Sequence, residues 1–119
     1  MRDPNPGIVI EVIDVIVSSG LVEQARSLLG DALRHGEGSV RKKAVEAMGL
    51  DYGQPVREMF LPLLKDPDPQ VRRAVLKRFL LAQDASIGTY LANIVKSGEI
   101  FAMDEDEQRE VFEAMGPNL

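Results

Sequence analysis

Apolar residues recur every three or four positions along most of this chain, which is the spacing of one buried helix face. The pattern predicts helices at about 21–34, 39–48, 54–65, 69–82, 85–96 and 105–115. Each predicted helix is separated from the next by a segment that contains Gly, Pro, Asp or Ser. The chain is therefore expected to be all-α.

Residues 5–18 allow two interpretations. They are rich in Ile and Val, and by propensity alone they would form a buried strand. Their polar or small positions are spaced by four, three and four residues, as on one strip of a helix: Gly7, Glu11, Asp14 and Ser18. Asn5 as N-cap with Pro6 at the first helical position supports the helix. We favour the helix, which brings the expected number to about seven.

The turns between these helices repeat. Segments 3–8 and 66–71 share the pattern Asp-Pro-x-Pro-x-Ile/Val and lie 63 positions apart. The Val-Arg motif at 40–41 lies 31 positions before the same motif at 71–72. A period in this range is typical of solenoids, in which each hairpin buries its apolar side against its neighbours. We therefore expect a right-handed α-solenoid of antiparallel helix hairpins.

Together these sequence motifs resemble HEAT repeats, and more narrowly the HEAT-like repeats of the bilin-lyase type. The resemblance rests on the two Asp-Pro segments, on Val-Arg-x-x-Ala/Val at 40–44 and 71–75, and on Glu-Ala-Met-Gly at 46–49 and 113–116. It covers nearly the whole chain. Two units depart from the pattern, because Val9 replaces the expected Arg and an acidic run replaces the aliphatic-Arg pair of the last unit.

The resemblance implies that the helices form an inner and an outer layer. Inner helices at about 5–18, 39–48, 69–82 and 105–115 would line a concave face, and the others would lie outside. Arg41 and Arg72 occupy the family's arginine position, which pairs with a carboxylate such as Asp66 and links successive repeats. Residues 1–119 are expected to form one HEAT-like domain, a segment of a longer array. Its uncovered ends, above all the apolar helix at 8–17, predict self-association.

Charge is placed unevenly along the chain. The net charge is −5 in total, with −2 over residues 1–34, +3 over 35–81 and −6 over 82–119. Lys42, Arg73 and Lys77 fall away from the predicted core and would form a basic stripe on the concave face. The alternative is that these side chains belong to an ordinary solvated helix face.

Other candidate sites have simpler explanations. The chain has no cysteine, and its one histidine, His35, cannot build a transition-metal site alone, so we interpret it as a surface turn residue. Segment 36–38 is too short to hold a phosphate and is expected to be a turn. The acidic run 104–107 suits a helix start better than a calcium site. No catalytic residue, metal or cofactor is expected.

These observations favour a non-enzymatic scaffold whose concave face binds a peptide or protein surface, with acidic groups on the partner. One alternative is an accessory role in bilin attachment or removal, which the resemblance permits. Another is nucleic-acid binding, which the sequence pI near 4.9 and the absence of tryptophan disfavour. The apolar stretch at 8–17 is interrupted by acids and is shorter than the ~20 residues of a membrane span. We expect a cytoplasmic protein.

Overall fold

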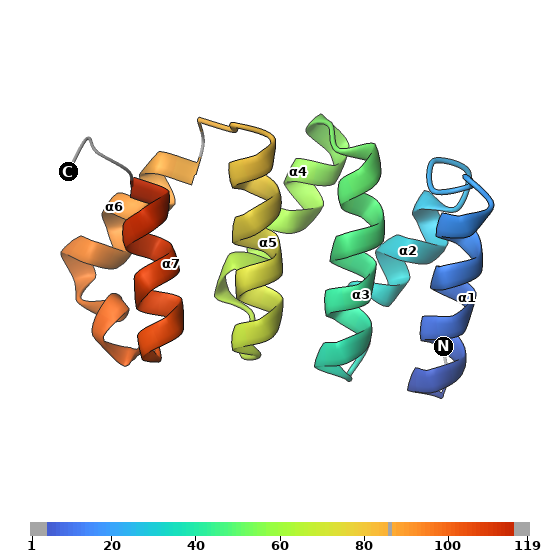
Figure 1. The fold of residues 1–119 in the computed structure, drawn as a ribbon, viewed down its shortest axis with the longest axis horizontal. Coiled ribbons are helices and arrows are strands. Elements are labelled where there is room, and N and C mark those ends of the chain that lie inside the picture. The colour runs from blue at the N-terminus through green and yellow to red at the C-terminus, as the bar shows by residue number, and fades with distance from the viewer. Residues whose placement is uncertain (1–4, 86, 116–119) are drawn as a thin grey trace. The chain divides into compact units, whose positions relative to one another are not determined.

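The computed structural model describes residues 5–85 and 87–115, and within these residues every regular element is helical. The helices are α1 (Pro6–Ser18), α2 (Arg26–Ala32), α3 (Gly38–Met48), α4 (Gln54–Phe60), α5 (Pro69–Leu81), α6 (Ile87–Ser97) and α7 (Glu105–Met115). Three short 3₁₀ helices lie between them: η1 (Gly49–Asp51), η2 (Leu61–Lys65) and η3 (Glu99–Ala102). The predicted all-α fold of helix hairpins is confirmed (Figure 1).

The ambiguous segment 5–18 is a helix. The side chain of Asn5 accepts hydrogen bonds from the backbone N–H groups of Gly7, at 2.9 Å, and Ile8, at 3.4 Å. Pro6 occupies the first turn, where its missing N–H costs nothing. The cap therefore overrides the strand propensity of the β-branched residues that follow.

Several helix boundaries differ from the sequence-based expectation. Residues 22–25 form turns, so the predicted helix 21–34 shortens to α2. A proline inside a helix is expected to kink it, and at Pro62, within the predicted helix 54–65, the α-helical geometry of α4 has given way to η2. Ser39 does not cap α3, which begins at Gly38 with Glu37 at the N-cap position. Glycine in segment 36–38 would suit a left-handed helix end, but among residues 5–85 and 87–115 the glycines with positive φ are Gly20 and Gly98.

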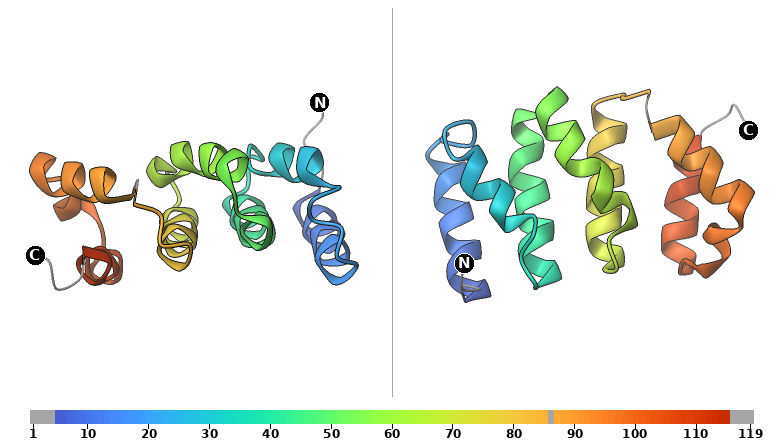
Figure 2. Two further views of the ribbon diagram at one scale, coloured as in Figure 1. Left: turned by 90° about the horizontal axis from the view of Figure 1, so that it is seen from above. Right: turned by 180° about the vertical axis from the view of Figure 1, so that it is seen from behind.

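The chain divides into two units, residues up to Val75 and residues from Leu76, which are described separately. In the first unit α1 and α3 lie side by side, and α2 and α4 form a second layer behind them (Figure 2). The start of α5 continues the first layer. The core of this unit is aliphatic with one aromatic ring: Ile13, Ile16, Leu29, Ala32, Leu33, Val40, Ala44, Val45, Ala47, Met48, Val56, Phe60, Leu64, Val71 and Val75.

In the second unit α6 packs against η3 and α7. Ile87, Leu91, Ile94, Ile100 and Val111 are buried there, together with Leu76 and Phe79 from the end of α5. The helical spacing of apolar residues predicts core positions for Ala82, Val95 and Phe112, but all three are exposed. The same prediction is wrong for Leu21 and Leu28 of the first unit. The apolar spacing also predicts a core position for the Met115 side chain, and Gly116 and Pro117 predict the end of the last helix. Both predictions lie outside the described residues.

Candidate binding site and the turns that position it

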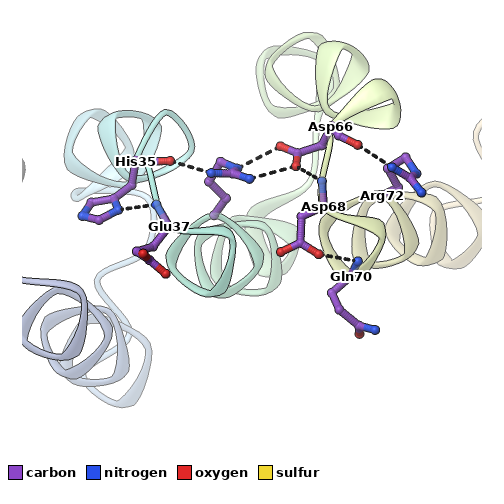
Figure 3. A network of polar contacts seen from close by, with 7 residues as sticks. His35, Glu37, Asp66, Asp68, Gln70 and Arg72 are labelled. Atoms are coloured by element: carbon purple, nitrogen blue, oxygen red, sulfur yellow. Dashed lines mark hydrogen bonds and ion pairs between the residues drawn. The ribbon is translucent and has the colours of Figure 1, made fainter.

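The same turn precedes α3 and α5. Before α5, the backbone N–H of Asp68 donates to Asp66 Oδ1 at 2.8 Å, and Arg72 Nη1 donates to the carbonyl oxygen of Asp66 at 2.7 Å. Before α3, the backbone N–H of Glu37 donates to His35 Nδ1 at 3.0 Å, and Arg41 Nη1 donates to the carbonyl oxygen of His35 at 2.8 Å. Figure 3 shows the two turns together.

Arg41 also connects the two turns. Its Nε and Nη2 donate to the two carboxylate oxygens of Asp66, at 2.9 and 3.0 Å, in a bidentate pair. The side chain of Asp66 is 3% exposed and that of Arg41 is 13% exposed, so the pair is largely shielded from water. The hydrogen bond with Asp66 raises the pKa of Arg41 above its ordinary value. Arg41 therefore fixes the start of α3 to the start of α5.

Asp68 holds the first turn of α5. Its Oδ1 accepts the backbone N–H of Gln70 at 2.8 Å, which is the capping interaction expected from the Asp-Pro segment. Its other side approaches α3, because a Cβ placed on Gly38 would overlap the Asp68 carboxylate. The close approach of the two helix starts thus depends on the missing side chain of Gly38.

The three predicted binding residues differ in exposure. Lys42 in α3 and Arg73 in α5 stand at equivalent positions, each directly after the arginine of its turn, and both are half-buried. Lys77 is exposed and lies four residues after Arg73 in α5. Lys42 and Arg73 belong to the first unit, and Lys77 belongs to the second.

An ion pair that sequence reasoning missed joins α1 to α3. Lys43 Nζ lies 2.7 Å from Asp14 Oδ1, and the hydrogen bond with Asp14 raises the pKa of Lys43. The side chains are 34% and 54% exposed, so the pair lies at the surface of the layer. The available signal was the polar strip of residues 5–18, since Asp14 lies on it and a neighbouring helix would place a side chain opposite.

His35 is buried rather than a surface turn residue, which corrects the sequence-based interpretation. Only 7% of its surface is exposed, because its ring lies in the turn and accepts a main-chain hydrogen bond. The segment after it does form the expected turn into α3. The sequence signal was the period, which sets His35 31 positions before Asp66.

The acidic run at the start of α7 contains the predicted cap. Asp104 Oδ1 accepts the backbone N–H of Glu107 at 2.8 Å, and Glu105, Asp106 and Glu107 make up the first turn. Among residues 5–85 and 87–115, no group of three or more His, Cys, Asp or Glu side chains is arranged to hold a metal ion. In the same part of the chain, no helix is both long enough and apolar enough to cross a membrane.

Helix hairpins joined by equivalent turns define an α-helical repeat protein. Residues 56–79, which cover most of α4, η2 and most of α5, match the family model described as HEAT repeat. This hairpin is a HEAT repeat, which confirms the predicted resemblance to HEAT repeats for residues 56–79, and HEAT repeats in general mediate contacts between proteins. No curated protein and no solved structure matches the chain.

Proposed function

We propose that this chain is a non-enzymatic scaffold that binds a protein or peptide on the face formed by α1, α3 and the start of α5. The observation that carries the proposal is the repeated turn of the first unit, in which Arg41 ties the start of α3 to the start of α5. Because Arg41 contacts the turns before both helices, α3 and α5 begin at equivalent points of their repeats. Equivalent side chains on these helices then lie on one surface, as is general for repeat proteins.

The chemistry of this face favours an acidic partner. Lys42 and Arg73 hold equivalent positions on neighbouring helices, and Lys77 adds a further cation one turn after Arg73. The segment that contains all three, residues 35–81, has a net charge of +3 in a chain that is acidic overall. Cations on a binding surface speed association with anionic partners and contribute to partner choice.

The proposal is tested by reversing the three charges. Wild-type protein is first used to select binders from a phage library of random peptides, and the selected peptides are expected to be enriched in Asp and Glu. Replacing Lys42, Arg73 and Lys77 together with Glu is expected to weaken binding at least tenfold. Affinity of the wild type is expected to fall with added salt, because exposed charge pairs are screened over ~8 Å at physiological ionic strength.

A matched control separates the site from the total charge. Arg34, Lys65 and Lys96 are exposed and lie outside α1, α3 and α5, so their replacement with Glu changes the net charge by the same amount. This control is expected to retain most of the affinity. Circular dichroism and the melting temperature check that both triple variants remain folded. Equal affinity of the wild type and the Lys42, Arg73 and Lys77 variant would show that the cations belong to a solvated helix face.

A further inference from the structure

Helices α1 and α3 can be aligned residue by residue from their first helical hydrogen bonds. The N–H of Val9 donates to the carbonyl of Asn5 at 3.1 Å, and the N–H of Arg41 donates to that of Glu37 at 3.2 Å. Each of these bonds closes the first turn of its helix. Val9 therefore corresponds to Arg41, and every other position of α1 corresponds to the residue 32 positions later in α3.

One flank of α1 is exposed although its counterpart in α3 is buried. In α1 the exposed fractions are 60% for Ile8, 41% for Val12 and 63% for Val15. At the corresponding positions of α3 they are 0% for Val40, 0% for Ala44 and 2% for Ala47. Helix α3 contacts both α1 and α2, the hairpin that precedes it. We call Ile8, Val12 and Val15 the free flank of α1.

The charge beside this flank is reversed relative to α3. Lys43 lies at the edge of the buried flank of α3 and reaches Asp14 of α1 at 2.7 Å. The residue that corresponds to Lys43 in α1 is Glu11. Glu11 is exposed, and it makes no ion pair with another described residue. A helix that packs on α1 as α1 packs on α3 would need a cation where α1 has Asp14.

We propose that the free flank of α1 binds an amphipathic helix of a partner protein that carries a Lys or Arg opposite Glu11. The apolar residues provide the contact, because exposed aliphatic side chains gain free energy when a partner covers them. Glu11 selects the sign of the charge on the partner helix. The free flank contains none of Lys42, Arg73 and Lys77, and its charge preference is the opposite of theirs.

A second copy of the chain fits this flank poorly. If α1 of another copy packed there as α1 packs on α3, its Asp14 would face Glu11, and two like charges at close range are unfavourable. The end segments 1–34 and 82–119 also have net charges of the same sign, −2 and −6. The predicted self-association is therefore the competing outcome of the test.

The probe is a helix-stabilised synthetic peptide with the sequence of residues 5–20, because this helix packs on the equivalent flank of α3. It is made in its native form and with Asp14→Lys. Binding to the full chain is measured by fluorescence anisotropy. The Asp14→Lys peptide is expected to bind the wild-type chain about fivefold more tightly than the native peptide, the effect of one exposed charge pair. In the Glu11→Lys chain the preference is expected to reverse.

Two further variants separate the flank from other surfaces. Val12→Ser is expected to abolish binding of the Asp14→Lys peptide without lowering the melting temperature, because Val12 is already exposed. Leu28→Ser changes an exposed apolar residue of α2 and is expected to leave binding intact. Equal affinity of the two peptides for the wild-type chain, or binding that survives Val12→Ser, would overturn the proposal. So would sedimentation that shows a dimer of the chain dissociated by Val12→Ser, because the flank would then be occupied by a second copy.

Discussion

His35 and Asp66 accept the same backbone hydrogen bond in successive repeats, His35 through an imidazole nitrogen and Asp66 through a carboxylate oxygen. The two turns differ in the residue at the equivalent position of the neighbouring helix of the same layer, which is α3 for Asp66 and α1 for His35. Arg41 pairs with Asp66, whereas Val9 stands at the position of Arg41 in α1. A carboxylate at position 35 would have no arginine at the equivalent position of α1 and would be costly to bury. A side chain that can be neutral therefore suits this turn.

His35→Asp is expected to lower the free energy of unfolding by about 2 kcal/mol, since it buries a carboxylate without a cation from α1. Adding Val9→Arg is expected to recover part of this loss by recreating the pair that Arg41 makes with Asp66. Urea unfolding of the wild type, both single variants and the double variant gives the coupling free energy between the two positions. A coupling near zero would show that positions 9 and 35 are not equivalent to 41 and 66.

The native histidine also matters as an acceptor, contrary to the expectation that follows from a surface position. His35→Ala leaves the N–H of Glu37 without its side-chain acceptor and is expected to cost about 1–2 kcal/mol. His35→Asn keeps an acceptor close to the main chain and serves as the conservative control. Equal stability of the Ala variant and the wild type would show that the hydrogen bond to the His35 side chain does not stabilise the fold.

Asp66→Asn is expected to destabilise the chain by about 3 kcal/mol, because it removes the carboxylate that forms the bidentate pair with the shielded guanidinium of Arg41. The matched control is Asp31→Asn, which breaks the exposed pair with Arg34 and is expected to cost less than about 0.5 kcal/mol. Chemical unfolding followed by circular dichroism measures both. If the two substitutions cost the same, the Arg41–Asp66 pair does not connect the repeats energetically.

The helices and the repeated turns could be predicted from sequence because both follow from local rules. Apolar spacing predicts each helix, and Asn5, Asp68 and Asp104 cap their helices through side chains that lie next to the helix start. Errors arose where packing between elements decides the outcome. The apolar residue Val95 is exposed and the polar residue His35 is buried, each against its usual tendency.

The surroundings of the proposed binding residues were harder to predict than the fold. A helical pattern shows that Lys42 and Arg73 lie off the core, but not that both are half-buried. The pairing of Lys43 with Asp14 requires knowing which side chains of neighbouring helices are opposite, and that depends on the register set by Arg41. Such contacts between helices leave no fixed spacing in one sequence.

Gly38→Ala is expected to lower the free energy of unfolding by about 1–2 kcal/mol, because the added methyl group must displace Asp68 from the N–H of Gln70. The matched control is Gly88→Ala in α6, where a Cβ meets no atom within 4 Å and helix propensity predicts a gain of up to about 1 kcal/mol. In an Asp68→Ala background the methyl group has no carboxylate to displace, so Gly38→Ala should become neutral or stabilising. Thermal unfolding of the single and double variants measures this dependence. An unchanged cost of Gly38→Ala in that background would mean that the methyl group acts on the helix itself and not through the cap of α5.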